Sequence, residues 1–212
     1  MGSIFFAVTG WLCELKMICV GDEGVDLWFK RSEGYGCGVA QVSREFLVSV
    51  LESYGMLAEK FERGEYGKPY LHGGPEFNLA HTEGCCVVAV SRGAVGVDIE
   101  RMDRRVRFGE LAERFYYSWE RERVKRLGVL EFLRIWVVKE AVIKLAGESL
   151  AGSLGEVETF FGGARLRGRE VWVAEFCEDG FVGAVAAWGE RRLRYFGFAV
   201  REDERLRCHF EV

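Results

Sequence analysis

Two carboxylates, Asp98 and Glu100, stand two residues apart in the stretch 95–100, which reads Val-Gly-Val-Asp-Ile-Glu. Successive side chains alternate across a β-strand, so both acids project from one face and the apolar residues from the other. Two carboxylates held side by side repel each other, and a divalent cation, which prefers hard oxygen ligands, removes that repulsion. The stretch therefore predicts a strand that carries a magnesium-type site.

A second acidic block follows about forty residues later, where residues 136–144 read Trp-Val-Val-Lys-Glu-Ala-Val-Ile-Lys. It offers Glu140 and, one helical turn away, Lys144. Carboxylates, a metal and lysines together are what phosphoryl or pyrophosphate chemistry needs. Taken singly, an Asp-x-Glu pair is typical of a solvated strand face and a Glu–Lys pair of a helix surface. The order and separation of the whole set favour a site.

Two further blocks lie upstream: Gly-Lys-Pro at 67–69 and Phe-Asn-Leu-Ala-His-Thr at 77–82. With these four blocks in order, the chain resembles the 4′-phosphopantetheinyl transferases, specifically the monomeric two-lobed class that activates peptide and polyketide synthetases. The resemblance spans residues 67–144 and weakens before about residue 40 and after about residue 155. It implies transfer of the 4′-phosphopantetheine group from coenzyme A to a serine of an apo carrier protein, with release of adenosine 3′,5′-bisphosphate.

The resemblance also assigns roles within the two acidic blocks. Asp98, Glu100 and Glu140 match the family's magnesium-ligand positions, and Mn²⁺ accepts the same oxygen ligands. Glu140 is in addition the expected base, direct or through water, for the carrier serine. Lys144 is expected to hold a phosphate oxygen as a point charge.

The upstream blocks imply the coenzyme A contacts. Lys68 is expected at the nucleotide phosphates, with Pro69 stiffening its loop, and His81 at the 3′-phosphate. Ala80 departs from the family pattern, which usually has serine there, so a hydroxyl expected at the 3′-phosphate is missing. Loss of such a hydrogen bond to a charged group costs roughly 1.5–3 kcal/mol, unless Thr82 or a backbone amide replaces it.

The roles of several other charged residues stay open. Glu120 aligns with an acid in the family's Phe-Phe-Ser-x-x-Glu stretch, and Lys139 reads either as a site residue or as a structural partner. A basic run at 101–107 is a candidate docking surface for an acidic carrier or an ordinary solvated loop. Its arginines are Arg101, Arg104, Arg105 and Arg107.

Periodicity predicts the elements that position these residues. Ser43 is expected to cap a helix that runs to about Ala58, and Gly147 to end a helix that starts near Leu130 and presents Lys139, Glu140 and Lys144 on its wetter side. Further helices are predicted at 108–117 and 118–127. Strands are predicted at 25–30, 85–90 and 95–100, and an antiparallel meander at 156–161, 170–176, 181–188 and 193–200.

Segregated helices and antiparallel strands indicate an α+β fold. By resemblance, the fold is two similar lobes, a pseudo-dimer in which antiparallel strands pack on helices and the active site lies in the cleft between lobes. The expected boundary separates an N-terminal lobe, 1–94, with the coenzyme A loops, from a C-terminal lobe, 95–212, with the metal site and catalytic helix. Residues 1–24 match none of the family's blocks.

Composition limits the remaining possibilities. The 212 residues are about half apolar and carry a net charge of −4, which argues against a general nucleic-acid binder. Seven cysteines without metal-ligand spacing favour free thiols in a reducing cytoplasm, and the absence of a run of eighteen apolar residues argues against a membrane span. Two alternatives stay open: a non-catalytic coenzyme A- or carrier-binding module, which Ala80 favours, and a magnesium-dependent phosphohydrolase, which leaves Lys68 and His81 without a role.

Overall fold

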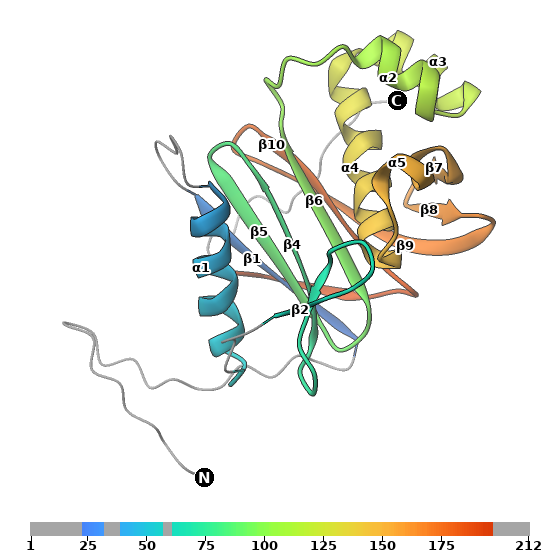
Figure 1. The fold of residues 1–212 in the computed structure, drawn as a ribbon. Coiled ribbons are helices and arrows are strands. Elements are labelled where there is room, and N and C mark those ends of the chain that lie inside the picture. The colour runs from blue at the N-terminus through green and yellow to red at the C-terminus, as the bar shows by residue number, and fades with distance from the viewer. Residues whose placement is uncertain (1–22, 32–38, 57–60, 197–212) are drawn as a thin grey trace.

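The computed structural model describes residues 23–31, 39–56 and 61–196, which form two sheets packed face to face between helices (Figure 1). The mixed α+β architecture with antiparallel sheets confirms the predicted class. No helix in the described ranges is long and apolar enough to cross a membrane.

The first sheet has the strand order β11-β1-β5-β4. Strand β5 pairs antiparallel with both β1 and β4, whereas β11 pairs parallel with β1. The bounds are β1 Gly24–Arg31, β4 Glu76–Thr82, β5 Cys85–Ser91 and β11 Arg192–Phe196. A separate two-stranded ribbon joins β2 Glu62–Arg63 to β3 Pro69–Tyr70.

The second sheet is antiparallel throughout, in the order β6-β10-β9-β8-β7. Its strands are β6 Val95–Arg101, β7 Val157–Phe160, β8 Gly163–Leu166, β9 Arg169–Glu178 and β10 Phe181–Ala187. The helices are α1 Val39–Glu52, α2 Phe108–Phe115, α3 Ser118–Leu127, α4 Val129–Ala146 and α5 Leu150–Ser153, with a short 3₁₀ turn at Leu154–Glu156.

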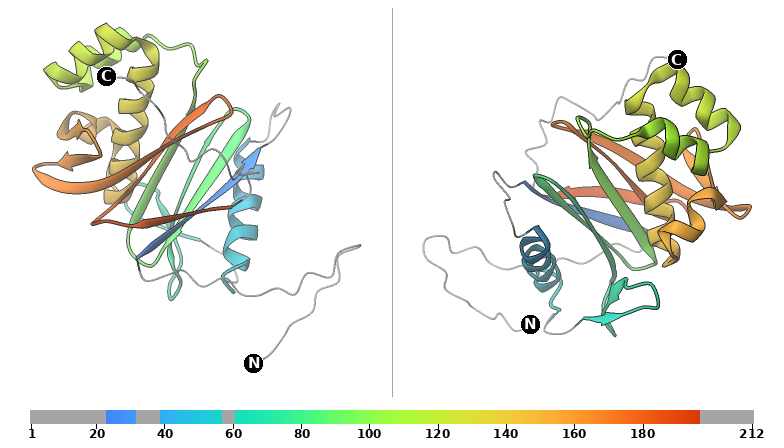
Figure 2. Two further views of the ribbon diagram at one scale, coloured as in Figure 1. Left: turned by 180° about the vertical axis from the view of Figure 1, so that it is seen from behind. Right: turned by 45° about the horizontal axis from the view of Figure 1, so that its top comes forward.

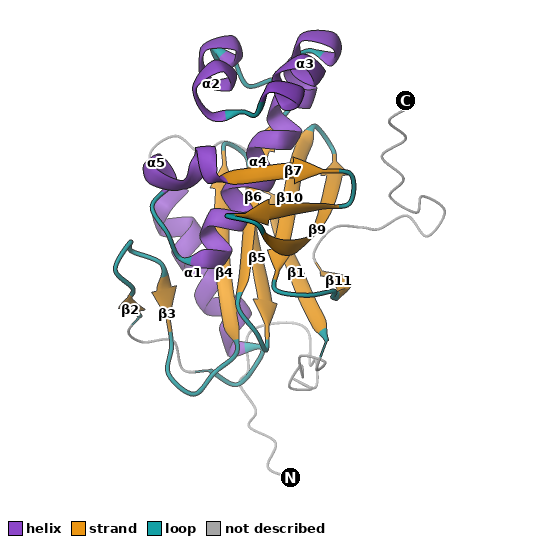
Figure 3. Ribbon diagram, turned by 90° about the vertical axis from the view of Figure 1, so that its right-hand side faces the viewer, coloured by secondary structure: helices purple, strands orange, loops and turns teal. Residues whose placement is uncertain are grey.

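The alternation of side chains along each strand explains how the layers pack on one another. In β5, Val88 and Val90 face α1, while Val87 and Ala89 face the second sheet, so the whole strand is buried. In the second sheet, Val182, Ala184 and Ala186 of β10 pack in the cluster that includes α4, and Val185 packs between the sheets. The result is α1, first sheet, second sheet and α4 in succession. Figure 2 shows α1 and α4 on opposite sides of the strands, and Figure 3 views the molecule from the side of α4.

The final described strand returns to the first sheet. Arg194 of β11 donates through two nitrogens, each at 2.6 Å, to the fully buried carboxylate of Asp26 in β1. The Tyr54 hydroxyl donates to the same carboxylate at 2.6 Å, and Phe196 stacks on Trp28 at 4.3 Å between ring centroids. Strand β11, which lies after the expected boundary at residue 94, therefore completes the sheet formed by the strands before that boundary.

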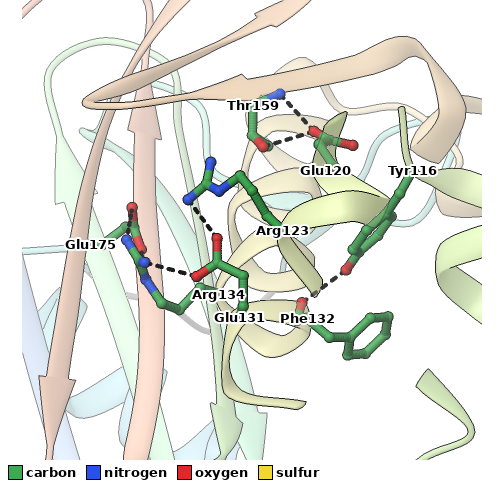
Figure 4. Close-up of polar contacts among 8 residues, drawn as sticks. All are labelled: Tyr116, Glu120, Arg123, Glu131, Phe132, Arg134, Thr159 and Glu175. Atoms are coloured by element: carbon green, nitrogen blue, oxygen red, sulfur yellow. Dashed lines mark hydrogen bonds and ion pairs between the residues drawn. The ribbon is translucent and has the colours of Figure 1, made fainter. Parts of the chain in front are cut away.

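Buried ion pairs hold α4 against its neighbours (Figure 4). Arg134 donates to both carboxylate oxygens of Glu175 in β9, at 2.8 and 3.1 Å. Glu131, almost fully buried, pairs with Arg134 at 3.0 Å and with Arg123 of α3. The Tyr116 hydroxyl donates to a carbonyl in the first turn of α4 at 2.8 Å. These contacts fix the helix that carries two of the predicted site residues.

Several element predictions are confirmed and others are wrong. The strands β1, β5 and β6 and the helices α2 to α4 lie where the sequence places them, and Gly147 ends α4 in the left-handed conformation, with φ 69°. Ser43 is not a cap: α1 begins at Val39, and the Ser43 hydroxyl is buried 3.1 Å from Cys86 Sγ. Residues 57–58 and 197–200 of the predicted helix and strand lie outside the described residues.

Two strand assignments also change. Strand β4, which contains the Phe-Asn-x-x-His block, and strand β8 were not predicted. The strand expected at 193–200 is not part of the antiparallel meander, because β11 pairs parallel with β1 in the other sheet.

Candidate functional site

The site is built on the close contact between β6 and α4. A methyl group at Gly96 would lie 2.0 Å from the Ala141 carbonyl oxygen and 2.3 Å from the Leu145 backbone nitrogen, so only glycine allows this approach. Asp98 and Glu100 lie on the same face of β6 as Gly96, because side chains alternate. Packing against α4 therefore brings both carboxylates to the helix face that carries Glu140 and Lys144.

Lys144 lies between two carboxylates. Its Nζ donates to Asp98 Oδ1 at 2.6 Å and lies 3.9 Å from Glu140 Oε2. The Asp98 side chain is 7% exposed and that of Glu140 14%, so neither charge is well solvated. The second oxygen of Asp98, Oδ2, is buried without a hydrogen-bond partner in the described structure.

Burial and crowding shift both carboxyl groups toward the neutral form. Burial raises the pKa of Asp98, against the lowering effect of the Lys144 ammonium. Burial, followed by the negative charge of Asp98, raises the pKa of Glu140 to about 7. One lysine thus does not neutralise this pair, and a further cation would stabilise it.

Glu100 is held by two partners on opposite sides. Its Oε1 forms an ion pair with Arg104, which a turn in the loop after β6 brings back over the strand. Its Oε2 accepts a hydrogen bond from the Thr82 hydroxyl at 3.3 Å. Thr82 thereby contacts the acidic strand directly, a role that sequence reasoning did not assign to it.

The upstream blocks bind the backbone of β6. Lys68 Nζ donates to the Val95 carbonyl at 3.1 Å, and burial lowers the pKa of this lysine. The buried Asn78 side chain accepts the Val97 amide at 2.9 Å. Strand β4, the edge of the first sheet, is therefore joined to β6, the edge of the second. Asn78 was overlooked as a structural residue, although its place in the Phe-Asn block was a signal that could have found it.

A hollow of about 570 Å³ opens where the ends of β4 and β6 meet. One side is formed by His81, Thr82 and Glu83, and the other by the end of β6 and its loop: Glu100, Arg101, Asp103, Arg104 and Arg105. Burial, then the nearby Lys144 ammonium, lowers the pKa of His81, which favours its neutral form. The hollow thus combines a histidine with several arginines between the two sheets.

Other predicted residues lie in different surroundings. Ala80 is buried in the core between the sheets and does not line the hollow, so its missing hydroxyl would face β6 rather than this space. Pro69 pairs with Arg63 in the β2–β3 ribbon. Arg101 binds Asp103 and lies 3.2 Å from Glu83, which leaves part of the basic run neutralised within the chain.

Lys139 and Glu120 form a structural pair. The expectation that Lys139 lies on the wetter side of α4 is wrong: both side chains are fully buried, with Nζ 2.9 Å from Glu120 Oε2. Glu120 also accepts bonds from the Thr159 amide and hydroxyl at 2.8 and 2.7 Å (Figure 4), and its Oε2 accepts the Tyr117 amide at the start of α3. Lys139 further donates to the Val157 carbonyl. The pair joins α3, α4 and β7.

The donor set fits a divalent cation in its chemistry. Asp98, Glu100 and Glu140 offer only carboxylate oxygens, which Mg²⁺ and Mn²⁺ prefer, and Asp98 Oδ2 is an orphaned acceptor. In the conformation of the described residues, however, no three acidic, histidine or cysteine side chains converge closely enough to hold a metal ion. Lys144 and Arg104 are the cations in contact with the acids instead.

Comparison with known proteins shows similarity over part of the chain. Residues 94–179, which include β6, α4 and the acids just described, match the model of the 4′-phosphopantetheinyl transferase superfamily. Similar proteins include the 4′-phosphopantetheinyl transferase gsp of Aneurinibacillus migulanus, 32% identical over 113 residues that cover 50% of this chain and 46% of that protein. The 4′-phosphopantetheinyl transferase HetI of Nostoc sp. is 32% identical over 145 residues, 61% of each chain. A Bacillus subtilis 4′-phosphopantetheinyl transferase is 34% identical over 93 residues, 41% of each.

The chain is thus similar, over residues 94–179 and the aligned segments, to 4′-phosphopantetheinyl transferases. The matched segment spans about half the length of these relatives.

Proposed function

We propose that the protein transfers the 4′-phosphopantetheine group from coenzyme A to a serine of an apo acyl, polyketide or peptidyl carrier protein and releases adenosine 3′,5′-bisphosphate. The observation that carries this proposal is the contact of Lys144 with Asp98 and Glu140 across the β6–α4 seam. It lies within the family-matched segment, and its chemistry, a lysine among under-neutralised carboxylates, is that of pyrophosphate transfer.

In this reaction the serine oxygen forms a bond to the β-phosphorus, and the bond from that phosphorus to the oxygen bridging to the α-phosphate breaks. Glu140 accepts the serine proton, directly or through a water, and its pKa of about 7 suits a base that works near neutral pH. Lys144 moves from Asp98 to a phosphoryl oxygen, where a positive charge stabilises the transition state. The bisphosphate leaves with the electron pair of the broken bond.

Asp98, Glu100 and Glu140 would hold Mg²⁺ or Mn²⁺, which supplies charge neutralisation on the pyrophosphate when bound. Lys68, held on Val95, and His81, in the hollow, are the proposed contacts to the nucleotide phosphates, with Pro69 and Thr82 beside them. The two sheet-and-helix halves would correspond to the two lobes of the monomeric class, and the hollow between them to the cleft.

The test is direct. The protein is incubated with Mg²⁺, coenzyme A and several apo carriers, and intact-mass spectrometry follows addition of one phosphopantetheine to the carrier. The same mixture with excess EDTA is the control. Mass gain that EDTA abolishes supports the proposal, whereas coenzyme A binding without mass gain on any carrier would identify a non-catalytic binding module. Release of phosphate from generic diesters would identify a hydrolase.

A further inference from the structure

Glu100 and Asp98 differ in which of their oxygens are engaged. Asp98 Oδ2 is a buried acceptor without a partner in the described structure. The nearby guanidinium of Arg104 pairs with Glu100, on the same face of β6, and not with this oxygen. Glu100 has both oxygens engaged, one by Arg104 and one by Thr82. A buried carboxylate oxygen without a protein partner offers a coordination position to a divalent cation.

The surroundings of Arg104 allow its side chain to leave Glu100. Its side chain is 44% exposed, it lines the hollow, and its ion pair is with Glu100. Arg101, the last residue of β6 and in the same hollow, contrasts with it: two bonds to Asp103 and an ion pair with Glu83 hold it in place. Because the Arg104 end of this single ion pair is exposed, water can solvate the guanidinium as it moves from Glu100 to another anion.

Thr82 remains on Glu100 when Arg104 leaves. Its hydroxyl binds Oε2, not the oxygen that Arg104 holds, so release of Arg104 frees Oε1 while Glu100 keeps its orientation. The same movement returns a planar guanidinium, which matches phosphate oxygens in two-point contacts, to a hollow that His81 also lines.

We infer that Arg104 is an exchangeable counterion: it neutralises Glu100 while the site is empty and moves to a phosphate oxygen of the incoming diphosphate when a divalent cation takes its place on Glu100. This inference rests on the proposed function, because the diphosphate and the cation are those of the proposed reaction. It assigns to Arg104 a binding role that depends on which ligands are present.

The exchange predicts effects of opposite sign for one substitution. Arg104→Met removes the competing cation, so Mg²⁺ alone should bind up to about 5-fold more tightly, the range of a weak exposed ion pair. In excess Mg²⁺ the same variant should bind inorganic pyrophosphate about 10-fold more weakly, because a charge-assisted contact is lost. Calorimetric titration measures both, and neither titration requires a carrier protein or turnover.

Two further variants control the result. Arg107→Met removes the same charge from the same loop, but Arg107 is 86% exposed and pairs with Glu110, so both affinities should stay as in the unsubstituted protein. Arg104→Lys keeps the positive charge and should leave Mg²⁺ binding nearly unchanged, while pyrophosphate binding weakens in part.

The outcomes separate the two proposals. Tighter Mg²⁺ binding together with weaker pyrophosphate binding supports the exchange, even if no carrier gains mass in the transfer assay. If Arg104→Met weakens both, leaves both unchanged or tightens both, the exchange is wrong, whatever the transfer assay shows.

Discussion

Lys144 and Asp98 are 46 residues apart in sequence, yet their charged atoms lie 2.6 Å apart in a largely buried setting. The contact spans the seam between α4 and β6, and Glu140 adds a second carboxylate on the lysine's other side. Because the single ammonium of Lys144 faces two carboxylates, the contact between α4 and β6 carries excess negative charge, which a cationic ligand would neutralise.

Asp98→Asn tests whether that charge serves catalysis rather than folding. We expect carrier modification to slow by at least about 100-fold, as expected when a metal site loses a ligand. The free energy of unfolding should fall little, because burial already disfavours the charged carboxylate, as its raised pKa indicates. Intact-mass kinetics and urea unfolding measure the two effects. Carrier modification at the normal rate in this variant would remove Asp98 from the site.

His81→Ala tests recognition of the 3′-phosphate. The variant should bind coenzyme A much more weakly but 3′-dephospho-coenzyme A almost as well as before. Calorimetry with both ligands gives the comparison, and equal losses for the two would mean that His81 is structural.

The same histidine predicts a pH dependence. Its lowered pKa means that the imidazole is largely neutral at neutral pH, and a cationic imidazole binds a phosphate more strongly. Coenzyme A affinity should therefore rise as pH falls below the ordinary histidine pKa of about 6.5 toward the lowered pKa of His81, and His81→Ala should flatten this slope. The folded state disfavours His81 protonation, so its contribution to stability is lost over the same fall in pH. A slope unchanged in the variant would assign the dependence to another group.

Gly96→Ala tests the seam itself. The added methyl group meets backbone atoms of α4, which cannot rotate away, so we expect the free energy of unfolding to fall by about 1–3 kcal/mol. Gly109→Ala is the matched control, because Gly109 lies on an exposed part of α2 with nothing within 4 Å of the added carbon. That change should stabilise by about 0.4–1 kcal/mol. Equal unfolding curves for the two variants would show that α4 is not held by this contact.

Lys139→Met tests the buried pair. It leaves the Glu120 carboxylate uncompensated in the interior and should destabilise the fold by about 3–5 kcal/mol. The double variant with Glu120→Gln should regain much of that loss, since neither charge remains. Lys125→Met, which breaks the exposed pair with Glu122, should leave the urea midpoint unchanged. If instead Lys139→Met unfolds normally but stops transfer, the lysine belongs to the reaction.

Periodicity was sufficient for the elements that bury apolar faces. The continuous apolar run of β5, the alternation of β6 and the long stripe of α4 follow from hydrophobic pattern alone. Strand β4 was not predicted because one of its faces carries the polar residues Asn78 and Thr82. Their side chains form hydrogen bonds to β6 in the other sheet, so this buried face shows no apolar pattern in the sequence.

Burial of charge was not predictable in the same way. The sequence predicts Lys139 on the wetter side of its helix, whereas in the structure it forms a buried ion pair with Glu120, nineteen positions away, between α3 and α4. The placement of Arg104 on Glu100 likewise depends on the course of a loop, for which the sequence carries no periodic signal. The family blocks predicted candidate site residues, whereas only the fold shows that Lys68 and Asn78 bind the backbone of β6.

The return of β11 to β1 has a consequence for how the chain is made. Asp26 is buried against a guanidinium that is translated 168 residues later, so during synthesis the first sheet has an open edge, and Asp26 has the Tyr54 hydroxyl but not its guanidinium partner, until β11 emerges. Early chains can form only a partial sheet, and a contact of such long range slows folding. Truncating the chain before β11 would therefore impair the N-terminal sheet rather than the segment nearest the cut.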